Sequence, residues 1–304
     1  MTDNYMKSWT GAEIKKTITD FVTKVTTENS PGFVPENKRI AVFDNDGTLW
    51  TEQPLQVEIF YALYRMKILA VKDPTLKNTQ PYKAFIEEDI KTLSKFGKKE
   101  LLEIAFKSHD GKTPQEFYSN VKDFFEKSLH PKFKFSYYNC AFKPQLELLD
   151  YLRANGFKIF IVSGGGLEFM RVVTEKIYGI PDERVIGSTI AKEVVYDGNK
   201  PVINRLPQLA NFDDREEKVL NIFNHIGSVP VLAFGNSDGD LSMLRYTLNS
   251  SENNLALLLH HDDAEREFAY DKDFVLSPLD EALKVAEAEG IRVVSMKNDW
   301  GKVF

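Results

Sequence analysis

Cysteine is almost absent from this sequence, and its scarcity excludes a disulfide framework. Cys140 is the single cysteine among 304 residues, so it cannot close an intramolecular disulfide bond. With no second cysteine nearby it is also a poor candidate for a metal ligand. We expect Cys140 to serve as a small apolar side chain.

Long apolar runs and basic tracts are missing too. The apolar runs, such as 159–162 and 255–259, have the length of strands and are far too short to cross a bilayer. Asp and Glu (45) outnumber Lys and Arg (39), which gives a formal net charge of -6. Without a basic cluster there is no electrostatic basis for binding a phosphate backbone. We therefore expect a globular protein with no membrane span and no nucleic-acid partner.

The first residues show no targeting segment. Residues 1–11 are polar and lack the basic flank and apolar stretch of a secretory signal. We expect a cytoplasmic protein, or a periplasmic one if a signal segment has been removed ahead of these residues.

What the sequence does contain is a repeated strand-then-turn pattern. With 42% hydrophobic residues the chain can bury a sizeable core. Three β-prone apolar runs each end in polar or glycine residues: 39–43 before 44–48, 158–162 before 163–166, and 230–234 before 235–240. Helical patterns occur at 11–27, 144–154, 167–178 and 215–225, and weaker strand patterns at 184–187 and 255–259. This alternation predicts an α/β fold with a Rossmann-like, doubly wound parallel sheet, whose three polar turns face one crevice.

More than a hundred residues separate the first two of these strands, far more than an ordinary crossover needs. Their patterns are helical, at 57–69, 82–93, 98–106 and 114–128. We expect residues 53–140 to form a helical cap domain inserted over the crevice, and residues 1–52 and 141–304 to form the Rossmann-like core.

The turn after the first strand carries the most specific motif. Asp44-Asn45-Asp46-Gly47-Thr48 follows a buried strand, Ser163 follows the second strand, Lys218 lies in a helix, and residues 235–240 follow the third strand. In this order the four motifs resemble those of the haloacid dehalogenase superfamily. The run 235–244 is similar to its phosphoserine-phosphatase-like branch.

The resemblance implies a phosphatase that acts on a phosphate monoester of a small molecule. Asp44 would be the nucleophile that is transiently phosphorylated, and Asp46 would protonate the leaving oxygen and then activate water. Ser163 and Gly164 would bind the phosphoryl group together with Lys218. An anionic nucleophile meets a phosphoryl dianion at a cost of roughly 8 kcal/mol at 4 Å and an effective dielectric constant near 20. Lys218 and Mg²⁺ would offset that repulsion.

The resemblance also implies a metal site and shows one departure from the family pattern. The ligands would be the Asp44 carboxylate, the Asp46 carbonyl and the first polar position of the fourth motif. That position is normally Asp and is Asn236 here. A neutral amide at this position should weaken Mg²⁺ binding. Asp238 or Asp240 could supply the missing negative charge, and we favour Asp240 because its spacing matches the second acidic position of the family.

Several residues keep more than one interpretation. His260 and His261, followed by Asp262 and Asp263, could bind a metal, although the aspartates are also suited to starting a helix. Glu52 and Gln53 stand where relatives begin the insert and contact substrate, or they have a surface role. Oligomeric state is left open by the sequence.

Two other functions compete with the phosphatase. A metal-independent dehalogenase would use the same aspartate, but such relatives generally lack the second one, which is Asp46 here. A catalytically weak protein that binds a phosphorylated ligand is conceivable because of Asn236.

Overall fold

The computed structural model describes residues 5–93, 96, 98–109, 113–249 and 253–304. The chain divides into two compact units. The first comprises residues 1–53, 138–187 and 212–304, and the second comprises residues 54–137 and 188–211.

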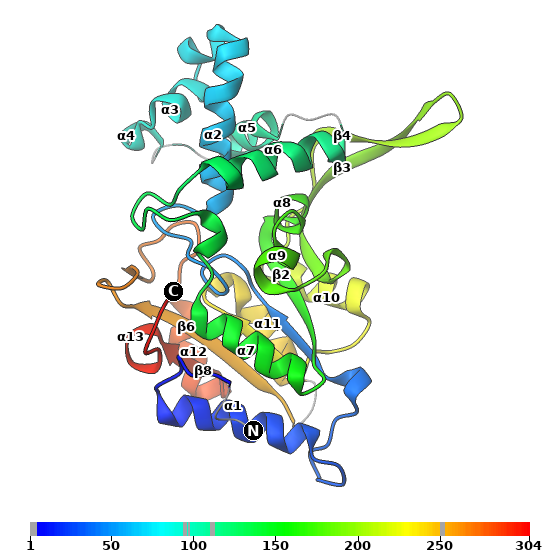
Figure 1. Cartoon of the computed structure of the whole chain (residues 1–304), viewed down its shortest axis with the longest axis vertical. Coiled ribbons are helices and arrows are strands. Elements are labelled where there is room, and N and C mark those ends of the chain that lie inside the picture. The colour runs from blue at the N-terminus through cyan, green and yellow to red at the C-terminus, as the bar shows by residue number, and fades with distance from the viewer. Residues whose placement is uncertain (1–4, 94–95, 97, 110–112, 250–252) are drawn as a thin grey trace. The chain divides into compact units, whose positions relative to one another are not determined.

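A parallel β-sheet forms the centre of the first unit (Figure 1). Its strands lie in the order β2-β1-β5-β6, and all three neighbouring pairs are parallel. β8 pairs with β6 in parallel and β7 pairs with β6 antiparallel. The bounds are β1 (Ile40–Phe43), β2 (Lys158–Gly166), β5 (Leu232–Gly235), β6 (Leu255–Asp262), β7 (Ala269–Tyr270) and β8 (Arg292–Ser295). The predicted α/β fold with a mostly parallel sheet is confirmed.

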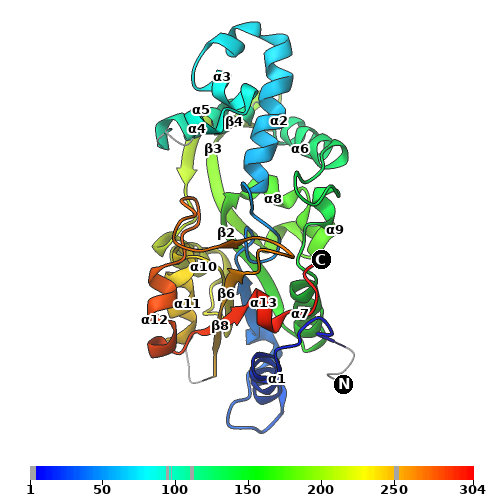
Figure 2. The ribbon, with the colours of Figure 1, turned by 90° about the vertical axis from the view of Figure 1, so that its left-hand side faces the viewer.

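Helices cover both faces of this sheet because its strands are apolar on both sides. In β1, Ala41 and Phe43 belong to one buried cluster, whereas Ile40 and Val42 belong to the other. The first cluster includes side chains of α1, α7 and α13, and the second those of α10, α11 and α12; Figure 2 shows α7 and α13 on one side and α10 to α12 on the other. The bounds are α1 (Ala12–Thr26), α7 (Lys143–Ala154), α8 (Leu167–Arg171), α9 (Thr174–Tyr178), α10 (Glu216–Ile226), α11 (Leu241–Leu248), α12 (Glu281–Glu289) and α13 (Met296–Asp299).

Cys140 lies in this first unit and is buried with its thiol free. Burial raises the pKa of the thiol well above its ordinary value, and the nearby negative charge of Glu267 adds to the increase. The side chain is therefore an inert part of the core, as the sequence predicts.

The second unit is built from helices around an aromatic and aliphatic core. The predicted helical patterns form five helices: α2 (Val57–Lys72), α3 (Tyr82–Glu87), α4 (Ile90–Leu93), α5 (Lys98–Ser108) and α6 (Pro114–Lys127). α6 begins with a capping box, in which Thr113 accepts from the Glu116 N–H and Glu116 accepts from the Thr113 N–H. Tyr61 of α2 packs edge-on against Phe117 and Phe124 of α6.

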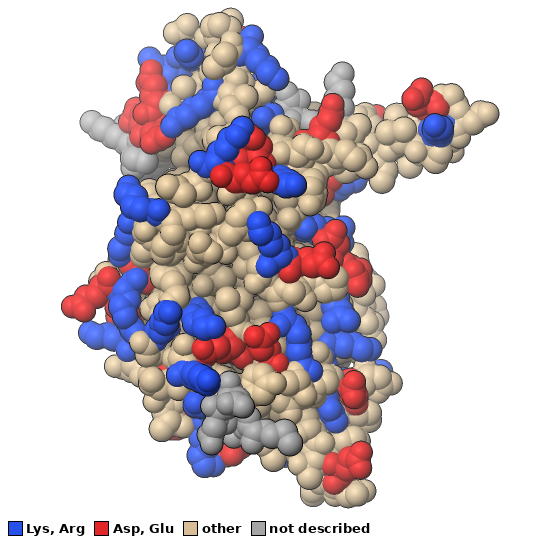
Figure 3. Space-filling view, in the orientation of Figure 1, with Lys and Arg blue, Asp and Glu red and all other residues tan. Residues whose placement is uncertain are grey.

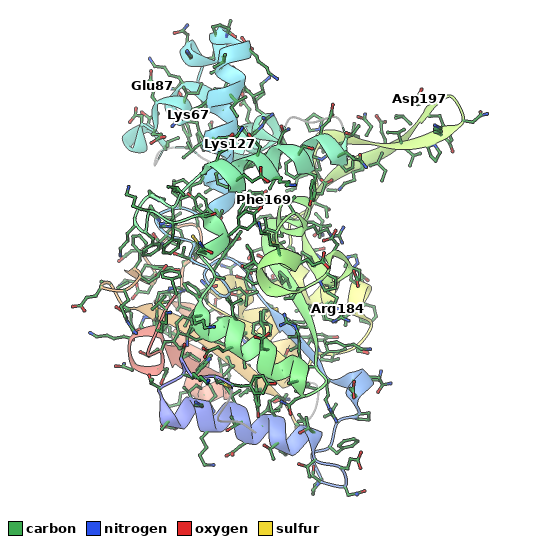
Figure 4. All side chains as sticks on the ribbon, viewed as in Figure 1. Lys67, Glu87, Lys127, Phe169, Arg184 and Asp197 are labelled. Carbon is green, nitrogen blue, oxygen red and sulfur yellow. The ribbon has the colours of Figure 1, made fainter. Side chains whose placement is uncertain are left out.

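A long antiparallel hairpin completes the second unit, and the sequence analysis did not foresee it. β3 (Val185–Asp197) pairs with β4 (Lys200–Asn211), and Asp197 lies near the tip of the ribbon in Figure 4. Arg205 fixes β4 to the helices, because its guanidinium lies 4.0 Å from the centre of the Phe117 ring and donates to the His109 carbonyl at 2.8 Å. Further along the ribbon, Val194 and Tyr196 are 61% and 71% exposed.

Two further observations bear on the classes of protein considered above. Within the described ranges, no helix is both long enough and apolar enough to cross a bilayer. Positive and negative side chains are interspersed on the face shown in Figure 3, as expected from the similar numbers of acidic and basic residues.

Candidate active site

Asp44 stands at the carboxyl end of β1, in the middle of the sheet. Its backbone N–H donates to the Phe234 carbonyl of β5 at 2.9 Å, so the neighbouring strand fixes the backbone at this position. The residue is 6% exposed. A strand that is buried on both faces thus delivers one carboxylate to the edge of the sheet where its neighbours also end.

Lys218 of α10 contacts β2 and the segments that follow β1 and β5. Its Nζ donates to Asp44 Oδ1 at 2.8 Å, to the Val162 carbonyl of β2 at 3.0 Å, and to Asp240 Oδ1 at 2.6 Å. The lysine is 3% exposed. All three donor positions of the ammonium are used, and the side chain is held rigidly between two acids.

The charges of this cluster shift the pKa values of both partners. Burial raises the pKa of Asp44 from 3.8 to about 7; Asp240 adds to the increase, and Lys218 opposes it. Burial lowers the pKa of Lys218, but the charges of Asp240 and Asp44 outweigh burial and keep it above its ordinary value. Lys218 is therefore a fixed positive charge, and Asp44 becomes a good nucleophile when further positive charge favours its ionised form.

Asp46 lies beside the carboxyl-terminal end of β2, which runs through Gly166 and so includes the residues expected from sequence to form a turn. Its Oδ1 accepts a hydrogen bond from the Trp50 indole N–H at 2.8 Å. Its Oδ2 would be only 3.1 Å from a Cβ placed on Gly165, so glycine there allows the close approach. Ser163 is 1% exposed, and its Oγ accepts from the Gly165 N–H at 3.3 Å. Asp46 thus lies close to the last residues of β2, Ser163–Gly166.

Gly47 is required by its backbone conformation and by its neighbours. Its φ is +77°, a region that strains other residues. A Cβ at this position would lie 2.2 Å from Asn236 Nδ2 and 2.4 Å from Glu52 Oε1. The Asp-Gly turn therefore does more than reverse the chain: it makes room for two side chains from elsewhere in the sequence.

Asn236 and Glu52 meet directly beneath this turn. Asn236 Oδ1 accepts from the Thr48 hydroxyl at 2.8 Å, and its Nδ2 donates to Glu52 Oε1 at 2.9 Å. Asn236 is 2% exposed and Glu52 is fully buried. Glu52 is therefore an internal residue of the site, so a surface role is wrong for it, and contact with substrate stays a prediction.

Asp238 and Asp240, the two acids considered as substitutes for an aspartate at 236, both have other partners. Asp240 Oδ2 accepts from the N–H groups of Asn236 and Ser237 at 2.9 and 3.0 Å, while its Oδ1 accepts from Lys218. Asp238 accepts from the N–H groups at the start of α12, including Ala282 at 2.8 Å. Asp240 thus shapes its own loop and holds the lysine, and Asp238 stabilises a helix N-terminus.

His261 supports the same turn from the opposite side. One ring nitrogen, Nε2, lies 2.7 Å from the Gly47 carbonyl, and Nδ1 lies 3.3 Å from Glu267 Oε2. His261 and Glu267 are both buried. His260, by contrast, lies in β6 opposite Ser295 of β8. The sequence contained the histidine pair, but nothing in it indicated that Gly47, 214 residues away, was the partner.

The oxygen atoms of this site are suited to a hard divalent cation. Among the described residues, no three His, Cys, Asp or Glu side chains form a metal-binding group. The candidates are instead of mixed type: the Asp44 carboxylate, the Asp46 carbonyl and the Asn236 amide oxygen. Carboxylate, carbonyl and amide oxygens are the protein ligands that Mg²⁺ prefers, with water completing the octahedron. The chemistry of the donors therefore fits Mg²⁺.

Two solved structures with TM-scores above 0.5 support the fold. A conserved protein of unknown function from Anaerococcus prevotii has a TM-score of 0.60 at 17% identity, over 97% of this chain and 94% of the other. A protein of unknown function from Bordetella pertussis has a TM-score of 0.54 at 14% identity, over 84% and 98% of the two chains. A phosphoserine phosphohydrolase-like protein from Francisella tularensis is also similar, at 17% identity and a TM-score of 0.41, over 74% and 89%.

Sequence comparison identifies the family. A search of curated proteins found no match. The family model described as haloacid dehalogenase-like hydrolase matches residues 41–245, which include the Asp44 turn, Ser163, Lys218 and the Asn236 loop. The chain therefore belongs to the haloacid dehalogenase-like hydrolases.

Proposed function

We propose that this hydrolase is a Mg²⁺-dependent phosphatase that hydrolyses the phosphate monoester of a small molecule through a phosphorylated Asp44. The observation that carries the proposal is the contact of Lys218 Nζ with Asp44 Oδ1 at 2.8 Å, in a site where both side chains are buried. Nucleophilic attack on an anionic phosphoryl group requires two groups, a nucleophilic carboxylate and a fixed positive charge.

The reaction consists of two displacements at phosphorus. In the first, an Asp44 oxygen bonds to phosphorus while the bond to the ester oxygen breaks, and Asp46 gives its proton to the departing alcohol. In the second, Asp46 takes a proton from water, the water oxygen bonds to phosphorus, and the bond to Asp44 breaks. Inorganic phosphate and the free carboxylate result, so Asp46 acts first as an acid and then as a base.

The remaining residues of the site bind and neutralise the phosphoryl group. We assign Ser163 and the Gly164 N–H, beside Lys218, to its oxygens. The Asp44 carboxylate, the Asp46 carbonyl and Asn236 Oδ1 would hold Mg²⁺, which supplies positive charge to the phosphoryl oxygens and to Asp44. Asp240 was the fourth ligand expected from sequence; because both of its oxygens accept hydrogen bonds, we propose it as the residue that positions Lys218.

We further propose that residues 53–140 form the cap that selects the substrate, with residues 1–52 and 141–304 as the catalytic core. The hairpin residues 188–211 group with the helices of the insert, so they are candidates for the same role. The cap shows no motif that identifies a substrate. Screening a panel of phosphorylated metabolites is the experiment that would identify the substrate.

The test of this function is phosphate release from para-nitrophenyl phosphate in millimolar Mg²⁺. We expect turnover by the natural protein, none by Asp44→Asn, and loss of activity in a strong chelator. Asp150→Asn is a matched control, because Asp150 is exposed and pairs only with Arg153 at 2.7 Å among the ion pairs of the described residues. An Asp46→Asn variant should accumulate a phosphorylated form that hydroxylamine removes.

The same assay separates the proposed function from its rivals. Phosphate release that persists in the chelator would contradict the Mg²⁺ dependence, whereas a metal-independent dehalogenase would release halide from a haloacid and no phosphate. A protein that binds phosphorylated compounds without releasing phosphate would be the binding protein. Phosphate release by Asp44→Asn at the natural rate would refute the role of Asp44.

A further inference from the structure

We infer that Glu52 supplies the carboxylate that Asn236 lacks, so that the Asn236–Glu52 pair acts as one acidic unit toward the cation of this site. Asn236 would be the ligand, and Glu52 would be the residue that positions it and provides the negative charge. The inference rests on the proposed function, because it concerns the cation which that function requires.

The first support is the direction of the hydrogen bond between the two side chains. Asn236 Nδ2 donates to Glu52 Oε1 at 2.9 Å, and Thr48 donates to Asn236 Oδ1 at 2.8 Å. The amide is thus held at both ends in one orientation. An aspartate at 236 would present a second acceptor to Glu52, and neither group could donate without taking up a proton.

The second support is the rigidity of Glu52. Its Oε1 also accepts from the Tyr270 hydroxyl at 2.9 Å, and its Oε2 accepts from the Ser277 hydroxyl at 2.7 Å. Tyr270 is itself fixed by stacking on His261, with ring centres 4.4 Å apart. Three donors on one fully buried carboxyl group hold it in place.

The electrostatics of the metal-free site oppose a negative charge on Glu52. Burial raises the pKa of Glu52 well above 4.5; the hydrogen bonds from Ser277 and Tyr270 oppose this, and the charges of Asp46 and Asp44 increase it further. The carboxylate form of Glu52 therefore needs positive charge nearby, which the cation would supply. Second-layer carboxylates of this kind orient a ligand and raise its basicity.

Together these contacts account for the departure of Asn236 from the family pattern. The acid is moved one hydrogen bond away from the cation, from position 236 to position 52, and the amide between them becomes the ligand. Gly47 makes the arrangement possible, because a Cβ there would overlap both side chains.

A double-mutant cycle tests the inference, using Glu52→Gln, Asn236→Asp and the combined variant. Mg²⁺ binding is measured on the full chain from the shift of the thermal unfolding midpoint across a MgCl₂ titration, without substrate. Glu52→Gln keeps an acceptor for Asn236 Nδ2 but removes the charge, so its Mg²⁺ affinity should fall about 10- to 100-fold. The combined variant should bind Mg²⁺ at least as tightly as the natural protein.

Metal-free stability gives an independent readout. Asn236→Asp alone should lower the unfolding midpoint, and adding Glu52→Gln should restore it, because the glutamine amide can then donate to the aspartate. Glu289→Gln is the control: it removes the same charge from a pair with Arg245 in the first unit, and its Mg²⁺ affinity should not change. Equal Mg²⁺ affinity in Glu52→Gln and the natural protein, or purely additive midpoints in the cycle, would overturn the inference.

The outcome is separable from that of the proposed function. If the natural protein releases no phosphate, the function fails, whereas the Mg²⁺ titrations and the cycle still measure the coupling. If the natural protein hydrolyses phosphate esters but the cycle shows no coupling, only the role of Glu52 fails.

Discussion

Asp44 should reduce the stability of the metal-free protein at neutral and alkaline pH, so we expect Asp44→Asn to unfold less readily than the natural chain. The folded-state pKa of about 7 lies above the ordinary 3.8 because the side chain is buried. The interval is about three pH units, each worth about 1.4 kcal/mol, so ionisation in the folded state costs up to about 4 kcal/mol. Asparagine has the same shape without that cost, and Lys218 can still donate to its oxygen.

The sign follows from which state binds the proton. Below pH 3.8 the carboxyl group is protonated whether the chain is folded or not, and asparagine gives no advantage. As the pH rises toward 7, the folded chain keeps its proton while the unfolded chain loses it, so the natural protein loses stability relative to Asp44→Asn. Above that pH the advantage of the variant is complete.

Urea unfolding in a chelator, at about pH 5 and about pH 8, measures this difference. The unfolding free energy of Asp44→Asn should exceed that of the natural protein by more at the higher pH. In a parallel titration with Mg²⁺ and no chelator, this difference should become smaller, because the cation favours the ionised Asp44 of the natural protein. A variant that is less stable than the natural protein at both pH values would refute the reasoning. So would a difference that does not change with pH.

Three other variants and treatments have expected outcomes. Lys218→Met should lower the unfolding free energy by about 3–5 kcal/mol in urea titrations, because it leaves two buried acids without their cation, and it should abolish phosphate release; unchanged stability would contradict the buried ion-pair geometry. Gly47→Ala should lower the unfolding free energy by more than about 1 kcal/mol and remove most of the phosphatase turnover, since the positive φ and the contact with Asn236 both oppose a side chain. Turnover at the natural rate would show that the turn can accommodate the methyl group. Cys140 should resist alkylation in the folded protein and react after denaturation, as mass spectrometry would show, because burial raises the pKa of its thiol; rapid labelling without denaturant would mean that the core opens.

Much of the fold could be predicted because its signals are local. The strand before Asp44 is four residues long and buried throughout, so a short apolar run was enough to find it. The helices of the insert have regular apolar spacing, and α6 even shows its capping box in the sequence. Motif order placed Lys218, an otherwise unremarkable lysine directly after two glutamates, among the candidate site residues.

The parts that escaped prediction depend on contacts between distant residues. Glu52 and Asn236 are 184 positions apart, and no pattern in either segment indicates the other. The β3–β4 hairpin did have a local signal, because Gly198 and Asn199 form a two-residue turn between β-branched and aromatic residues. A prediction of alternating helices and parallel strands leaves no place for an antiparallel hairpin.

β4 is an edge strand, and this position affects whether the protein aggregates at high concentration. An edge strand of 12 residues would ordinarily invite a strand from another molecule to extend it. Pro201 and Pro207 bring no N–H to that edge, and Lys200 places a charge at its start. An incoming chain would meet an interrupted ladder, so the ribbon can stand in solvent without serving as a template for fibrous assembly.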